Sequence, residues 1–175
     1  MRDSLSIRGT TTRDLVSLHA VIERAYRGDT ARLGWTHEAD LLSGPRTTAD
    51  VLDEIVADPR QRLLSAWIDA RPVGCVAVAD RGGGLAYLGQ LCVEPTLQAG
   101  GLGRRLIAAA ERTAVAAFHA DRIEMTVIDS RTELIAYYLR RGYHVTGERR
   151  DFPIPLDPPL FMTVLEKPLT ALVAS

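Results

Sequence analysis

A glycine-rich turn between a strand-like segment and a helix-like segment constrains this chain more than any other feature. The run Leu85–Val93 is largely apolar, and residues 98–103 (QAGGLG) lead directly into a segment with helical spacing. Several N–H groups at a helix start lack intrahelical partners, and the macrodipole places about half a positive charge there. Because glycine has no Cβ, an anion can approach these N–H groups, so the turn predicts a phosphate or pyrophosphate site. A tight turn that uses glycine for its conformation alone is the structural alternative.

Two common phosphate-binding motifs do not match this turn. The P-loop has a lysine and a serine or threonine after its last glycine, whereas Arg104 and Arg105 follow here. The dinucleotide-binding motif has a third glycine or alanine where this chain has Leu106, and it belongs to repeated βαβ units. The sequence therefore disfavours a nucleoside triphosphate site and a dinucleotide site.

Hydrophobic periodicity predicts an α/β chain without repeats or linkers. The expected strands cover residues 4–8, 62–69, 73–79, 85–93, 122–128, 143–148 and 160–166, with turns at 70–72 and 80–84. One helix is expected directly after the glycine turn, and three others at the capping pairs Thr11/Asp14, Thr47/Asp50 and Ser130/Glu133. The length of 175 residues fits one domain, residues 1–175.

Composition and charge exclude several classes of function. The chain has 21 basic and 22 acidic residues, so its formal charge of −1 gives no field that would attract nucleic acid or an anionic membrane. We expect no membrane span and no secretory signal, because no apolar run is long enough. Cys75 and Cys92 are expected to be reduced thiols of a cytoplasmic protein. We expect no metal site, because the four histidines lack metal-ligand spacing: His19, His37, His119 and His144.

A second motif follows the glycine turn by about forty residues. Tyr138 stands four residues before Gly142, which we expect to end a helix, so the phenol can point past the last helical turn. The alternative is that Tyr137 and Tyr138 are ordinary core or rim aromatics. A helical aromatic residue is most often of that kind.

Three motifs occur in a fixed order: Val93-Glu94-Pro95, Gln98-x-x-Gly101-x-Gly103 and Tyr138-x-x-x-Gly142-Tyr143. With these motifs, the chain resembles the GNAT superfamily of acyl-CoA-dependent N-acetyltransferases over most of its length. The resemblance implies a single GNAT-like domain with a mixed, mainly antiparallel sheet of six or seven strands, flanked by about four helices. Residues 85–93 and 122–128 would form the central parallel pair. The chain departs from the family at Arg131, where many members carry asparagine, so the role of this position stays open.

The resemblance also implies which residues hold acetyl-CoA, the expected co-substrate. Backbone N–H groups in the glycine turn would surround the pyrophosphate, and the strand before it would bind the pantetheine arm and polarise the thioester carbonyl. The implied coenzyme-binding residues are Leu91, Cys92, Val93, Gln98, Ala99, Gly100, Gly101, Leu102, Gly103 and Arg104.

Tyr138 would act as the general acid. It would protonate the departing thiolate, whose ordinary pKa of roughly 8.5 makes a phenol a suitable donor. Because the acyl group passes directly to the amine, Cys92 is not needed as a nucleophile. The general base stays open among Glu94, Glu23 and Asp129.

The acceptor is expected to bind to the segment between the first two helices. The candidate residues there are Trp35, Glu38, Asp40 and Arg46. A carboxylate suits an ammonium group, and Arg46 suits a carboxylate on the same substrate. The alternative is that Trp35 anchors the loop on the core while the charged residues face water.

These observations lead to one expected function with alternatives. We expect an acetyl-CoA-dependent N-acetyltransferase that acts on a primary amine of a small molecule, without nucleic-acid or membrane partners, with a homodimer as a possible assembly. A protein N-terminal or lysine acetyltransferase would share the chemistry. A non-catalytic acyl-CoA sensor would share the fold, since fold alone does not determine function.

Overall fold

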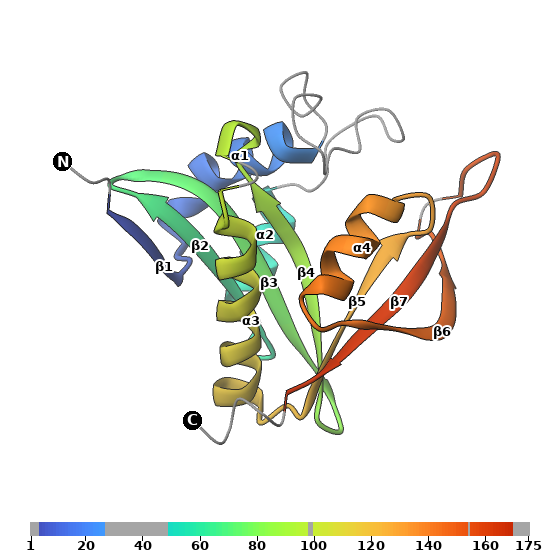
Figure 1. The fold of residues 1–175 in the computed structure, drawn as a ribbon. Helices are drawn as coiled ribbons and strands as arrows, with labels where there is room; N and C mark the ends of the chain where they lie inside the picture. The colour runs from blue at the N-terminus through green and yellow to red at the C-terminus, as the bar shows by residue number, and fades with distance from the viewer. Residues whose placement is uncertain (1–3, 27–48, 98–99, 154, 170–175) are drawn as a thin grey trace. The chain divides into compact units, whose positions relative to one another are not determined.

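The computed structural model describes residues 4–26, 49–97, 100–153 and 155–169. Within these ranges its elements are seven strands, four α-helices and two short 3-10 helices (Figure 1). In order they are β1 (Leu5–Gly9), η1 (Thr12–Asp14), α1 (Leu15–Tyr26), α2 (Ala49–Ala57), β2 (Gln61–Ile68), β3 (Arg71–Gly82), β4 (Leu85–Val93), η3 (Pro95–Leu97), α3 (Leu102–Phe118), β5 (Arg122–Ile128), α4 (Thr132–Arg140), β6 (His144–Asp151) and β7 (Phe161–Pro168).

The strands form one mixed sheet in the order β1-β2-β3-β4-β5-β7-β6. The neighbours β1–β2, β2–β3, β5–β7 and β6–β7 run antiparallel. Strands β4 and β5 run parallel, with the register Leu85↔Arg122 to Tyr87↔Glu124. The expected α/β class, the seven mainly antiparallel strands and the central parallel pair are confirmed.

The chain divides into two compact units. The first holds residues 1–79 and 88–113, and the second holds residues 80–87 and 114–175, so β3, β4 and α3 contribute to both. The single domain over residues 1–175 stays a prediction. No helix in the described part of the chain is both long and apolar enough to cross a bilayer.

The first unit has a core on each face of its strands. On one face, α1 and α2 bury their apolar stripes against β2, β3 and β4; this cluster contains Leu15, Leu18, Val21, Ile22, Ala25, Leu52, Ile55, Leu63, Cys75, Ala77 and Cys92. Figure 1 shows α2 behind these strands and α3 in front of them. Successive strand residues point to opposite faces. Gly74, next to Cys75, accordingly faces α3, where an ideal Cβ would lie 3.1 Å from Leu106 Cδ1.

The second unit contains a two-residue hairpin turn and an ion pair between Glu124 on β5 and Arg150 on β6. Gly83 and Gly84 have φ of 62° and 82°, the positive values that a tight β-hairpin turn requires. Glu124 on β5 is buried, and its two carboxylate oxygens accept hydrogen bonds from Arg150 on β6 at 3.2 Å each. The hydrogen bonds that Arg150 donates to Glu148 and Glu124 raise the pKa of its guanidinium.

Three local expectations are wrong. Residues 70–72 do not form the turn, because β3 already begins at Arg71 and Pro72 pairs with Trp67 beside a register shift. Strand β3 also continues to Gly82, so the hairpin turn is shorter than residues 80–84. The cap of α4 is Arg131 instead of Ser130, and it makes no side-chain capping bond. At the first helix the expected cap is confirmed, since Thr11 N donates to Asp14 Oδ2 at 2.8 Å.

We predict that Gly74→Ala destabilises the protein. Its Cβ would lie 2.7 Å from the Cys92 carbonyl oxygen, which belongs to the backbone and cannot move aside without shifting β4. Overpacking of this kind costs about 1–3 kcal/mol, measurable as the free energy of unfolding in urea. Gly9→Ala is the control, because nothing lies within 4 Å of the place that its Cβ would take. Equal stability of the two variants would contradict this account of the β3–β4 contact.

Candidate active site

The connection from β4 to α3 is held by backbone hydrogen bonds at its start. Glu94 N donates to the Val73 carbonyl oxygen at 2.8 Å, so β3 still holds the chain one residue past β4. Leu97 N then donates to the Glu94 carbonyl oxygen at 2.8 Å and closes the η3 turn. These two hydrogen bonds fix the backbone just after β4, the strand that is predicted to bind the coenzyme.

The start of α3 has the features of an anion site. The Arg105 N–H donates to the Gly101 carbonyl oxygen at 3.2 Å, and Gly100 N donates to the Leu97 carbonyl oxygen at 3.4 Å. The N–H groups of Leu102 to Arg104 belong to the first turn of the 17-residue α3, where N–H groups lack intrahelical partners. Gly101 has a φ of 83°, a conformation that favours glycine, and Gly100 is exposed. The residues present here fit a phosphate group. Gln98 and Ala99 lie outside the described residues.

Arg24 at the end of α1 forms a two-pronged ion pair with Glu94. Arg24 Nη2 donates to Oε2 at 2.8 Å and Nε donates to Oε1 at 3.2 Å. The hydrogen bonding that Arg24 donates to this carboxylate raises the pKa of Arg24. Because both Glu94 oxygens take part in the pair, it links the end of α1 to the first residue after β4.

Strand β4 carries two unusual features near its end. Cys92 is 4% exposed within the core cluster, and its Sγ lies 3.3 Å from Sγ of Cys75; the two residues form no disulfide. Gln90 has a φ of 52° inside the strand, and its backbone oxygen accepts a hydrogen bond from the Cys75 thiol at 3.2 Å. The backbone of β4 thus departs from regular strand geometry at Gln90, two residues before Cys92.

The motif around Tyr138 is a Schellman cap. Tyr143 N donates to the Tyr138 carbonyl oxygen at 3.2 Å, and Gly142 N donates to the Leu139 carbonyl oxygen at 3.1 Å. Gly142 has the left-handed φ of 98° that this cap requires. The Tyr138 ring is 5% exposed and packs edge-on against Tyr143 and Tyr137, with centroid distances of 6.0 Å and 5.5 Å. The cap explains why the tyrosine and the glycine are four residues apart.

The carboxylate of Asp129, another candidate base, is engaged after the end of β5. Its Oδ1 accepts from Thr163 Oγ1 at 2.6 Å, and its Oδ2 accepts from Arg149 Nε at 2.9 Å. The third candidate, Glu23, lies 3.6 Å from Nε2 of His19 on the same helix. These contacts do not identify which of the carboxylates is the general base.

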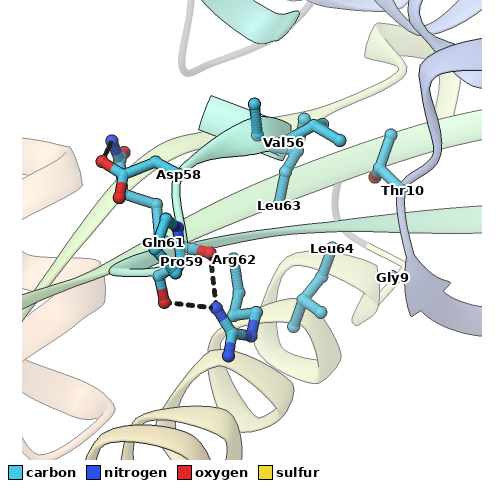
Figure 2. A pocket seen from close by; sticks show the side chains of 10 residues that line it. Gly9, Thr10, Val56, Asp58, Pro59, Gln61, Arg62, Leu63 and Leu64 are labelled. Carbon is cyan, nitrogen blue, oxygen red and sulfur yellow. Dashed lines mark hydrogen bonds between the residues drawn. The ribbon is translucent and has the colours of Figure 1, made fainter. Parts of the chain in front are cut away.

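The four predicted acceptor residues, Trp35, Glu38, Asp40 and Arg46, lie outside the described residues. A cavity of about 250 Å³ lies elsewhere in the first unit, beside the end of α2 and the start of β2 (Figure 2). Arg62 is one of its lining residues, and its Nη1 donates to the carbonyl oxygens of Pro59 at 2.8 Å and Gln61 at 2.9 Å, the dashed lines in Figure 2. Among the predicted site residues that the structure describes, none lines this cavity.

Sequence reasoning missed Arg24 and Gln90. Arg24 carried no signal, because its partner Glu94 is seventy positions away. Gln90 carried a signal in the sequence, since it is an amide in an otherwise largely apolar strand.

Comparison with known proteins agrees with this geometry. Residues 24–143 match the model of the Acetyltransferase (GNAT) family. A relative from Azospirillum brasilense, named IAA acetyltransferase, is 35% identical over 128 residues, which cover 71% of this chain and 80% of the relative.

Solved structures share the fold at low sequence identity. The ribosomal-protein-S18-alanine N-acetyltransferase of Escherichia coli has a TM-score of 0.73 and 16% identity, covering 95% of this chain and 94% of that one. A spermidine N-acetyltransferase chimera from Vibrio cholerae and hSSAT has a TM-score of 0.74 and 15% identity, covering 98% and 99%. The protein yncA of Salmonella typhimurium, solved with acetyl-CoA, has a TM-score of 0.71 and 15% identity, covering 95% and 94%. By its sequence match and its fold, the chain belongs to the GNAT family of acetyltransferases.

Proposed function

We propose that this chain is an acetyl-CoA-dependent N-acetyltransferase that acts on a primary amine of a small molecule. The observation that carries the proposal is the glycine turn at the start of α3. It follows β4 through the short η3 turn, and Val73 and Arg24 hold the residue after this strand, Glu94. Family membership supports the acetyl transfer, and the transfer to nitrogen is the finer part of the proposal.

In this proposal the turn and the strand hold the co-substrate. Bound acetyl-CoA supplies an acetyl group activated as a thioester. The N–H groups of Gly100 to Arg104, with Gln98 and Ala99, bind the pyrophosphate. Those of Leu102 to Arg104 lie in the first turn of α3, at the positive end of the helix. Backbone groups of Leu91, Cys92 and Val93 bind the pantetheine arm.

Tyr138 supplies the proton in the same proposal. The amine nitrogen bonds to the acetyl carbon, the carbon–sulfur bond breaks, and the Tyr138 phenol gives its proton to the leaving sulfur. The amine loses a proton to a base that is not assigned. The Schellman cap supports this role, because it holds the backbone that carries the phenol at a helix end. The acceptor residues Trp35, Glu38, Asp40 and Arg46 stay a prediction.

The first test concerns acetyl-CoA binding. Gly101→Asp places a negative charge where the pyrophosphate should lie, so we expect the dissociation constant to rise at least tenfold from the micromolar range, or about 1.4 kcal/mol. Calorimetric titration measures this change. Gly83→Asp is the control, because it adds the same charge at another glycine with positive φ, and nothing lies within 4 Å of the place that its Cβ would take. Unchanged affinity in a folded Gly101→Asp variant would remove the phosphate site.

The second test concerns Tyr138. Tyr138→Phe keeps the ring and deletes only the hydroxyl, so we expect kcat to fall by about 10²–10⁴ while the KM for acetyl-CoA stays unchanged. Release of free thiol with a panel of amines measures the rate, and a matching panel of alcohols separates N-transfer from O-transfer. Tyr137→Phe is the control, since it lies about 100° around the helix. A loss in Tyr137→Phe alone would reassign the acid, and tight binding without turnover on any amine would favour the sensor.

A further inference from the structure

Gln90 occupies a strained backbone conformation inside strand β4. Its φ of 52° lies in the left-handed region, which a glutamine in the middle of a strand rarely adopts. The Cys75 thiol donates to its carbonyl oxygen at 3.2 Å and helps to hold the backbone there. Strained residues of this kind persist where the surrounding structure enforces them, and they concentrate at functional sites.

The side chain of Gln90 carries a second anomaly. Its Oε1 atom is buried and has no hydrogen-bond partner among the described residues. A buried acceptor that has left water without a partner is costly, and most such groups in native proteins are satisfied. The strain and the unpaired oxygen thus occur at one residue.

We propose that Gln90 Oε1 accepts a hydrogen bond from an N–H group of a bound ligand. The residue directly precedes Leu91, the first of the strand residues that we propose to bind acetyl-CoA, and the inference rests on that proposed function. A neutral amide oxygen accepts a hydrogen bond but takes up no proton at ordinary pH. Gln90 therefore positions the N–H group and is not the general base.

Two ligands offer such a group: the acceptor amine and the amides of the pantetheine arm. Each source predicts a different kinetic result in Gln90→Met, which keeps the length of the side chain and removes the oxygen. If the amine is the donor, its KM rises at least tenfold and the dissociation constant for acetyl-CoA stays constant. If pantetheine is the donor, the dissociation constant rises at least tenfold.

The melting temperature of the ligand-free protein separates a ligand contact from a structural one. Because Oε1 has no partner to lose, we expect Gln90→Met to melt at or above the wild-type temperature. Gln61→Met is the control, since Gln61 Nε2 donates to Asp58 Oδ2 at 3.0 Å and its loss should not change either ligand constant. Gln90→Asn serves if the methionine variant does not fold: asparagine tolerates the left-handed backbone and draws the oxygen back by about one bond length.

A selective tenfold loss for one ligand, without a lower melting temperature, supports the inference and names the donor. Unchanged constants for both ligands overturn it, as does a lower melting temperature with unchanged constants. If the wild-type protein binds no acetyl-CoA, the proposed function fails first, independently of Gln90.

Discussion

The close contact between β3 and β4 at Gly74 is the constraint on which the first unit depends. The Cys92 carbonyl oxygen and Leu106 of α3 both lie where a side chain at Gly74 would be. One residue along, Cys75 meets Cys92 on the opposite face, within the core formed by α1 and α2. Strand β4 is therefore packed from both faces, which stabilises the end of the strand before the glycine turn.

The parts of the fold that the sequence predicted well are those with sharp boundaries. Strands β4 and β5 match the expected ranges because apolar runs end there at turn or charged residues. The start of β3 was missed because Pro72 was interpreted as a turn residue. A strand admits proline beside an irregularity, and the β2–β3 ladder has a register shift at that point.

The candidate site was predictable only where neighbours in sequence form it. The glycine turn and the capped end of α4 are local motifs, so spacing located both. The Arg24–Glu94 ion pair joins residues far apart in the chain, and no local pattern indicates it. The left-handed φ of Gln90 accompanies a hydrogen bond from Cys75, fifteen positions away in the chain, and no local pattern indicates this contact.

The Schellman cap has a consequence for how an acid group on α4 would work. The Tyr138 carbonyl oxygen accepts a hydrogen bond from Tyr143 N, so the backbone position of Tyr138 is fixed when the chain folds. A donor on a mobile loop would lose conformational entropy in every catalytic cycle. Because the cap holds the backbone of Tyr138, this conformational entropy is lost once, on folding, and not in every catalytic cycle. A variant with a weakened cap would therefore still fold but catalyse the reaction more slowly.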